Sequence, residues 1–503
     1  MRIGRATLHK GRRQVGIPYR SFPLPIHWEK VAVGMLTVGL LTLLNGELRA
    51  LPSQWLGRMG MAVAQVGLLI ALLSYLGLNR PTGLALRSPL AHSARETGIV
   101  LLLLIGVMSL VGVRMASAIA DGGALTPTHG FLSFVPLIAG AMLLSVLIHP
   151  LAALVVSAIL LTGVAWVLRV PIQTLGVVGL AAWGSALTIA PMRRRSHLIW
   201  TGVLVGLLLA VASAMLSWQA GQDMVRVGTS AFWGVIGGVG TMALFWLGLN
   251  LIERPFRLAT PLTLMELASL EHPLLRTLRE KAPGTYFHSQ MVGQLAEEAA
   301  LAIGADPLLA RVAGYYHDVG KLTRPDFYVE NQTTINAHER INPALSARII
   351  ASHVRDGVDL AHQHRLPTAL CEIIAQHHGT SLITYFYHQA IGAGHDPVLE
   401  QHFRYPGPKP QTREAGIIML ADTVEAATRS LGEVAPSRLA NFVHEMITMR
   451  LQDGQLDEST LTFRDIKRIE EAFVRVLVAS RHRRMEYPAS TTEGSETYAV
   501  RTS

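Results

Sequence analysis

One short run of this sequence places two kinds of metal ligand side by side. His317-Asp318 stands within YYHDVGK, which spans residues 315–321. An imidazole supplies a nitrogen ligand to borderline divalent metals, and a neighbouring carboxylate can span two of them. A His-Asp pair also arises by chance, so its meaning depends on whether other ligand-type residues accompany it.

Further ligand-type residues do accompany this pair. Twelve of the 20 histidines lie between His272 and His402, so the enrichment is local. Burying adjacent imidazoles or a lone carboxylate costs free energy, which a bound cation offsets. Five histidines and two aspartates exceed the needs of one ion and predict two divalent ions, Mn²⁺ or Fe, that share a carboxylate. The candidate ligands are His288, His317, Asp318, His353, His377, His378 and Asp422.

Lys321 follows Asp318 by one helical turn, where its ammonium group can neutralise a phosphate oxygen. A solvated lysine at a helix end carries equal weight from the residues alone. The lone Cys371 is interpreted as a small buried apolar side chain, and a single cysteine excludes a thiolate zinc site. The histidines left as ordinary polar residues are His338, His362, His364, His388, His395 and His402.

Composition indicates a membrane protein. Half of the 503 residues are hydrophobic and only 16% are charged. Apolar runs long enough to be membrane helices predict about eight spans, at 31–46, 58–78, 97–117, 131–149, 151–168, 171–190, 197–217 and 229–252. Lysine and arginine concentrate in the loops on one side, which predicts that both termini are cytoplasmic. The net charge of +9 is assigned to those loops, so we expect no DNA or RNA polymer as a partner.

Within the last span, Gly234 and Gly238 lie one helical turn apart. They lack the strand and the Lys-Ser/Thr of a nucleotide loop, so they predict close packing against another helix. After residue 253 the charge density rises and helical periodicity continues without strand patterns. The predicted fold is therefore all-α. Its parts are a basic cytoplasmic segment (1–30), a helical transmembrane domain (31–253), a connecting helix (254–281, with its helical pattern over 263–279), a metal-binding helical domain (282–482) and a disordered tail (483–503).

Four long segments carry a family resemblance. They are TPLTLMELASLEHPLLRTLREKAPGTYFHSQMV, ARVAGYYHDVGKLTRPDFYVENQ, INPALSARIIASHVRDGVDLA and IAQHHGTSLITYFYHQA. They resemble the seven-transmembrane HD-domain proteins, the PgpH-type cyclic-di-AMP phosphodiesterases. The resemblance implies that one ion is held by His288, His317, Asp318 and Asp422. It implies that the second ion is held by His353, His377 and His378, with Asp318 as the bridge and Lys321 on the phosphate.

The same resemblance implies a multi-pass protein of the cell membrane that hydrolyses cyclic di-AMP to pApA in the cytoplasm, in second-messenger turnover. Two departures stand out. Phe287 occupies a position where the family suggests histidine, and the loop at 47–57 leaves no room for the family's large extracytoplasmic domain. Regulation is the property that the second departure affects.

Other functions remain open at this point. The HD domain can hydrolyse another nucleotide, cyclic di-GMP or a nucleoside phosphate, because nothing in the residues names adenine. A membrane receptor that binds a nucleotide without cutting it is a further alternative, against which the complete ligand set argues. No span carries an ionisable residue at its centre, which disfavours a transporter. The expected partners are the cyclic dinucleotide, the lipid bilayer and, as a candidate, a second copy of the chain.

Overall fold

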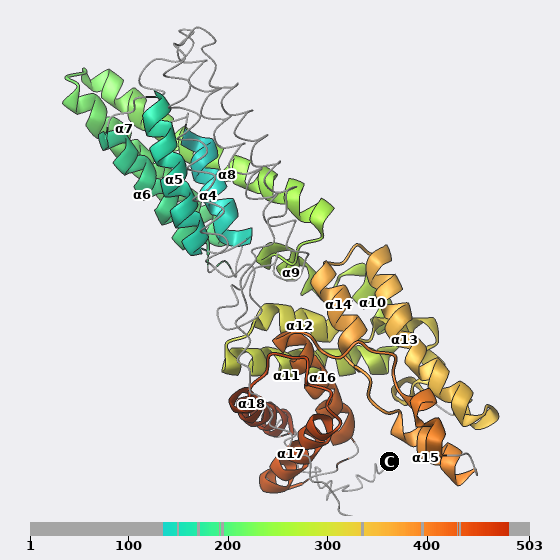
Figure 1. Cartoon of the computed structure of the whole chain (residues 1–503). Coiled ribbons are helices and arrows are strands. Elements are labelled where there is room, and N and C mark those ends of the chain that lie inside the picture. Colours follow the sequence, from blue (N-terminus) through green and yellow to red (C-terminus); the bar gives the residue numbers. More distant parts are fainter. Residues whose placement is uncertain are drawn as a thin grey trace, which may run out of the picture. The chain divides into compact units, whose positions relative to one another are not determined.

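The structure is a computed structural model. It describes residues 134–481, apart from 148–149, 169–171, 191, 193–195, 333–335, 394–396, 430 and 432–433. Within this part of the chain there is no strand, and the only β-type pairing is an isolated bridge between Leu382 and Arg404. The all-α prediction is confirmed (Figure 1). The predicted spans at 31–46, 58–78 and 97–117, the basic segment 1–30 and the tail 483–503 lie outside the described residues.

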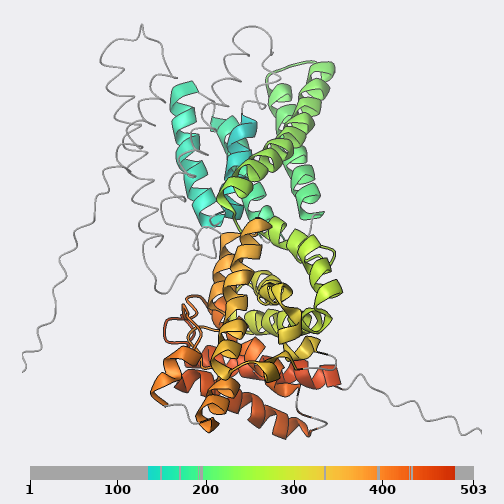
Figure 2. The same ribbon diagram turned by 90° about the vertical axis from the view of Figure 1, so that its right-hand side faces the viewer.

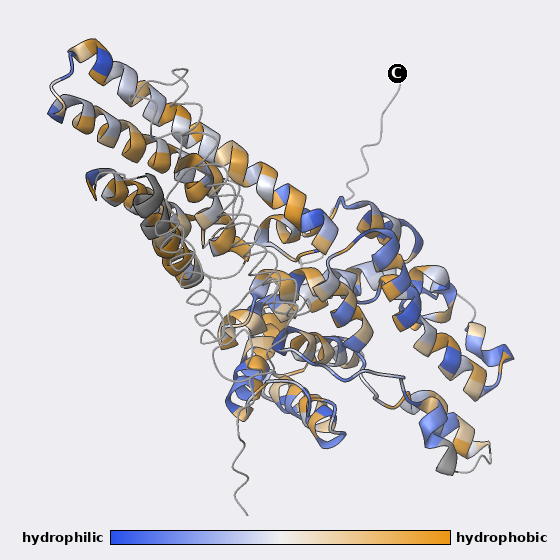
Figure 3. Cartoon of the chain, turned by 45° about the horizontal axis from the view of Figure 1, so that its top comes forward, coloured by the Kyte–Doolittle hydropathy of each residue, from blue (hydrophilic) through white to orange (hydrophobic). Residues whose placement is uncertain are grey.

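A first group of helices is strongly apolar. It comprises α4 (Val135–Leu147), α5 (Pro150–Leu168), α6 (Ile172–Ile189), α7 (Ser196–Gln219) and α8 (Met224–Phe256), seen together in Figure 2. By length and composition, α6, α7 and α8 can each cross a membrane. Hydrophobic residues recur along their whole lengths (Figure 3). Large side chains such as Trp200 and Leu207 remain exposed, as expected for surfaces that face lipid.

Glycines allow α7 and α8 to pack closely. A Cβ at Gly234 would lie 2.4 Å from the backbone nitrogen of Ala210, and a Cβ at Gly238 would lie 2.4 Å from the Cα of Gly206. Only glycine permits backbones to approach so near. The predicted packing role of Gly234 and Gly238 is therefore confirmed.

The second group of helices follows Arg257, the residue that ends α8. Its α-helices are α9 (Pro261–Leu267), α10 (Pro273–Lys281), α11 (Pro283–Ile303), α12 (Pro307–Tyr316), α13 (Pro343–Gln363), α14 (Thr368–Gln376), α15 (Thr384–Gly392), α16 (Arg413–Thr428), α17 (Pro436–Gln452) and α18 (Phe463–Arg481). Short 3-10 helices lie between them: η2 (Val319–Thr323), η3 (Pro325–Phe327), η4 (Val329–Asn331), η5 (Ala337–Arg340) and η6 (Pro397–Phe403).

The prediction of one continuous helix over 263–279 is wrong. The segment forms α9 and α10 instead, because Pro273 cannot continue a helix from residue 272 but is well suited to begin one. His272 caps the new helix, since its Nδ1 accepts a hydrogen bond from the backbone N–H of Leu274 at 3.4 Å.

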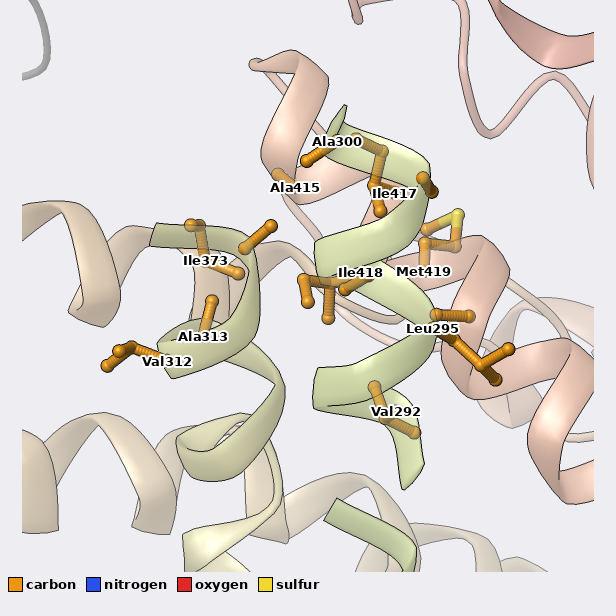
Figure 4. Close-up of a cluster of buried hydrophobic side chains, with 14 of the residues drawn as sticks. Val292, Leu295, Ala300, Val312, Ala313, Ile373, Ala415, Ile417, Ile418 and Met419 are labelled. Atoms are coloured by element: carbon orange, nitrogen blue, oxygen red, sulfur yellow. The ribbon is translucent and has the colours of Figure 1, made fainter. Parts of the chain in front are cut away.

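The core of this second group lies between α11, α12, α14 and α16. Val292 and Leu295 from α11 belong to one buried cluster with Ile417 and Met419 from α16, and Ile373 of α14 joins it (Figure 4). The cluster also includes the aromatic rings of Tyr286 and Tyr316 and the thiol of Cys371, which is buried as predicted. Helices α11 and α16 carry candidate metal ligands, and others directly follow α12 and α14, so this core fixes the positions of most of the ligands.

Two glycine contacts bring the ligand-bearing segments together. Helices α11 and α12 cross where a Cβ at Gly314 would lie 2.4 Å from the Cα of Gly293. Residues 319–323 (η2) lie against α13, where a Cβ at Gly320 would lie 1.9 Å from the carbonyl oxygen of His353. The first contact brings His288 near His317, and the second brings Asp318 near His353.

Candidate metal centre

All seven predicted ligands meet in one buried cluster. Their donor atoms form two groups, within each of which the atoms lie within 4.8 Å of one another. The carboxylate-rich group is His288, His317, Asp318 and Asp422. The histidine-rich group is Asp318, His353, His377 and His378. The ligands come from α11, α13, α16 and the residues that follow α12 and α14.

Two of the ligand pairs, the doublets His317-Asp318 and His377-His378, lie directly after the ends of helices. The last residue of α12 is Tyr316 and that of α14 is Gln376, so His317-Asp318 and His377-His378 follow directly. Consecutive residues within a helix point about 100° apart and do not face one target. Beyond the helix end the backbone turns, and Asp318 has φ −106° and ψ 14°. Both members of each doublet therefore face the same centre.

Asp318 lies between the two groups and presents a different oxygen to each. Its Oδ2 lies 3.3 Å from Nε2 of His317 and 3.4 Å from Nε2 of His288. Its Oδ1 lies 3.3 Å from Nε2 of His353 and 3.7 Å from Nε2 of His377. A carboxylate in this position can bind one ion through each oxygen.

Asp422 adds a second carboxylate to the centre. Its Oδ1 lies 3.0 Å from Nε2 of His288, and its Oδ2 lies 3.5 Å from Nδ1 of His378. The exposed fraction of its side chain is 11%. This carboxylate therefore contacts imidazoles of both groups.

Backbone carbonyls fix the orientation of three imidazole rings. The Nδ1 atoms of His317, His353 and His377 lie 2.8, 2.6 and 2.6 Å from the carbonyl oxygens of Gly314, Ile350 and Ile374. Each acceptor is the residue three positions earlier in the chain. With Nδ1 donating to a carbonyl, each ring turns its Nε2 toward the centre, where it can bind a metal ion when it carries no proton.

Two buried atoms at the centre that have no hydrogen-bond partner are suited to bind a cation. His317 Nε2 and Asp318 Oδ1 are buried and have no hydrogen-bond partner in the structure. Leaving such atoms unpaired costs about 1–3 kcal/mol each, and more for a charged group. One divalent ion in each group would satisfy them, since His317 Nε2 faces the carboxylate-rich group and Asp318 Oδ1 the histidine-rich group, so the residues present suit metal binding.

The two groups differ in their proton affinity. Burial lowers the pKa of His317, but the carboxylates of Asp318 and Asp422 outweigh it and raise that pKa to about 9. The pKa of His288 is likewise raised against burial, by Asp318, Asp422 and Glu425. Burial lowers the pKa of His353 to about 4, despite the nearby Asp318. At neutral pH His288 and His317 therefore hold protons that His353 lacks.

Glu425 is a functional residue that the sequence reasoning missed. Its Oε2 is hydrogen-bonded to Nδ1 of His288, and its Oε1 accepts from Nε of Arg429 at 2.9 Å. It therefore orients the His288 ring through Nδ1, as backbone carbonyls do for His317, His353 and His377. Glu425 follows Asp422 by three residues on α16, a spacing that places both on one helical face and was available as a signal.

Lys321 is not a solvated helix-end lysine. Its side chain is 13% exposed, and Nζ lies 2.7 Å from Asp318 Oδ2 and 2.8 Å from Glu330 Oε1. Burial raises the pKa of Glu330, but the ammonium group of Lys321 outweighs it and lowers that pKa. No sequence pattern pointed to Glu330, because it joins Lys321 across irregular 3-10 turns.

Two tyrosines border the centre. The ring of Tyr405 stacks on His378 with a centroid distance of 4.2 Å and an angle of 27°. The ring of Tyr328 meets His353 edge-on at 5.8 Å and lies under the ammonium group of Lys321 at 5.1 Å. Phe287, beside His288, is 67% exposed. None of the histidines left as ordinary polar residues belongs to either group, as far as the described residues show, and His395 lies outside them.

Two family models match this chain. Residues 285–427 match the HD domain, and residues 55–260 match the family described as a 7TM receptor with intracellular HD hydrolase. The chain therefore is an HD-domain protein. Over residues 55–260 it is similar to the membrane region of the seven-transmembrane HD family.

The similar proteins include two curated phosphodiesterases. The chain is 35% identical to the cyclic-di-AMP phosphodiesterase PgpH of Bacillus subtilis, over 85% of this chain and 59% of that protein. It is 40% identical to PgpH of Listeria monocytogenes, over 60% of this chain and 43% of that protein. The solved HD domain of the Listeria protein in complex with cyclic di-AMP is 44% identical over 43% of this chain and all of that domain, with a TM-score of 0.41. The chain thus spans about three fifths of the Bacillus protein.

Proposed function

We propose that this chain is a membrane-anchored phosphodiesterase that uses two divalent ions to hydrolyse cyclic di-AMP to pApA. The observation that carries the proposal is Asp318, whose two oxygens each face a different group of ligand nitrogens. The names of the curated relatives support the choice of substrate.

We assign the ligands by their positions in the two groups. His288, His317 and Asp422 would hold one ion and His353, His377 and His378 the other, with Asp318 shared between them. When bound, two such ions would polarise a phosphoryl oxygen and would lower the pKa of a water molecule enough to make it nucleophilic at neutral pH. Mn²⁺ or Fe is the expected metal, because imidazole and carboxylate suit both and no thiolate is available.

The remaining residues of the site have roles in binding and charge compensation. Lys321 supplies a positive charge beside Asp318, where a substrate phosphate oxygen can exchange for Glu330 as its partner. Tyr405 and Tyr328 flank the ligand imidazoles and exclude water from that side. A buried setting strengthens each of these electrostatic contacts.

We also propose the division of the chain and its topology. Residues 31–253 form the multi-pass membrane domain, 254–281 connect it to the HD domain at 282–482, and both termini face the cytoplasm. The apolar helices α6 to α8 support the membrane part. In this topology the α7–α8 loop is extracytoplasmic. Arg226→Cys should therefore react with an impermeant maleimide on intact cells, whereas Ser437→Cys should react only after lysis.

The deciding experiment uses the full-length protein in detergent, loaded with Mn²⁺ or Fe²⁺. Cyclic di-AMP and cyclic di-GMP are compared, with Asp318→Ala as the test variant and the exposed Asp326→Ala as its matched control. We expect rapid formation of pApA by the wild type and the control, and none by Asp318→Ala. Binding of cyclic di-AMP without cleavage, in protein shown to carry two ions per chain, would instead identify a receptor.

A further inference from the structure

Arg450 is a cation beside the metal centre whose terminal nitrogens have no partner among the described residues. It lies on α17, and its Nε donates a hydrogen bond to Oγ1 of Thr423 at 2.9 Å. Thr423 is anchored in turn, since its hydroxyl donates to the carbonyl oxygen of Met419 at 2.8 Å. Within the described part of the chain, no hydrogen bond or ion pair involves the other two guanidinium nitrogens.

Arg450 lies near Asp422 and Tyr405, at the edge of the metal centre. Thr423, which it contacts, directly follows Asp422, and Asp422 reaches His378, on which Tyr405 stacks. Burial lowers the pKa of Arg450, and the negative charges of Asp422 and Asp453 oppose that effect. The guanidinium is thus partly desolvated without an ion-pair partner, which is costly unless a ligand supplies the anion.

Lys321 is a second cation at the centre. It is held by Asp318 and Glu330 and lies over Tyr328. Lys321 therefore already has two carboxylate partners, whereas the terminal nitrogens of Arg450 have none within the described residues. A guanidinium group whose two terminal nitrogens are unpaired can bind a phosphate through two parallel hydrogen bonds.

A cyclic dinucleotide carries two phosphodiesters, and hydrolysis to a linear dinucleotide opens only one. The phosphate that is not cut keeps its negative charge and must leave water when the substrate binds. We propose that Arg450 binds this second, uncleaved phosphate and so selects substrates that carry two. This inference rests on the proposed function, and it adds a residue to substrate recognition that is neither a metal ligand nor part of the HD pair.

The test compares two substrates on full-length protein loaded with two ions per chain. Cyclic di-AMP has two phosphodiesters, and bis(p-nitrophenyl) phosphate has one. The variants are Arg450→Met, Arg450→Lys and a matched control, Arg438→Met, which removes an exposed arginine from the first turn of the same helix. Steady-state kcat and KM are measured for each protein with each substrate, and the metal content of each variant is checked.

We expect Arg450→Met to lose more kcat/KM on cyclic di-AMP than on bis(p-nitrophenyl) phosphate, by about 10- to 100-fold and mainly through KM. Arg450→Lys should recover part of that loss because it keeps the charge. Arg438→Met should stay within about twofold of the wild type on both substrates. If Arg450→Met lost the same factor in kcat/KM on both substrates, or lost none on either, the proposal would be overturned.

Equilibrium binding gives a second readout that does not depend on turnover. Cyclic di-AMP is titrated into wild type and Arg450→Met after the ions have been removed with a chelator, and we expect about 10-fold weaker binding by the variant. Equal affinity would refute the contact. Failure of the proposed function is distinguishable, because then the metal-loaded wild type itself would not cleave cyclic di-AMP, and the inference would fall with it.

Discussion

Replacing Gly320 with alanine should open the metal centre without unfolding the protein. A Cβ at this position would lie 1.9 Å from the carbonyl oxygen of His353 and 2.5 Å from the backbone nitrogen of Gly357. Both atoms belong to the backbone of α13, so no side-chain rotation relieves the clash. Because a Cβ does not approach closer than 3.0 Å, η2 and α13 must separate by about 1 Å (3.0 minus 1.9).

That separation is large compared with what a metal site tolerates. Metal–ligand distances hold to within about 0.2 Å. Asp318 lies just before Gly320 and His353 lies on α13, and their Oδ1 and Nε2 atoms are now 3.3 Å apart. Overpacking of this kind costs about 1–3 kcal/mol, less than the stability of most domains. We therefore expect a folded protein that holds one ion in place of two.

The assay is metal content by mass spectrometry after gel filtration, with hydrolysis and thermal unfolding measured on the same sample. The variant should lack the ion of the histidine-rich group. Its activity should fall at least about 100-fold, and its melting temperature should fall by a few degrees. Gly392→Ala is the matched control, because a Cβ at this helical glycine meets nothing within 4 Å. Two tightly bound ions and unchanged turnover in Gly320→Ala would refute the reasoning.

Three more predictions follow from the site and the helix packing. Glu425→Gln should weaken metal binding by about 10- to 100-fold, because His288 loses the carboxylate that orients it. Calorimetric titration would measure the affinity, and an unchanged affinity would contradict this prediction. Metal binding by the carboxylate-rich group should tighten as pH rises from about 6 to 9, because the raised pKa values of His288 and His317 mean that protons must leave before the ion binds. Proton release measured in two buffers of different ionisation enthalpy would test this, and the histidine-rich group should contribute none through His353, whose pKa of about 4 leaves it already neutral. Gly238→Ala should lower the melting temperature in detergent by forcing α7 and α8 apart, whereas Gly228→Ala, with open space around its Cβ, should not; equal melting temperatures would argue against close packing at Gly238.

The order of amino acids was sufficient to predict the all-α class, the apolar helices from residue 131 onward and the packing role of Gly234 and Gly238. It also supplied the residue types of a two-ion site. These features are local: helical periodicity, glycine spacing and the cost of burying polar groups can all be judged within a short window. The break between α9 and α10 was equally local, since Pro273 marks it, but the periodic pattern on both sides concealed it.

The arrangement of the centre was decided by the tertiary structure. Which oxygen of Asp318 faces which histidine depends on how η2 meets α13, and the doublets face one centre only because α12 and α14 end just before them. Glu425 reaches His288 across 137 residues of chain, and Arg450 reaches Thr423 across 27. A sequence pattern records which faces are buried, whereas the pairing of those faces is set by the packing of distant segments against one another.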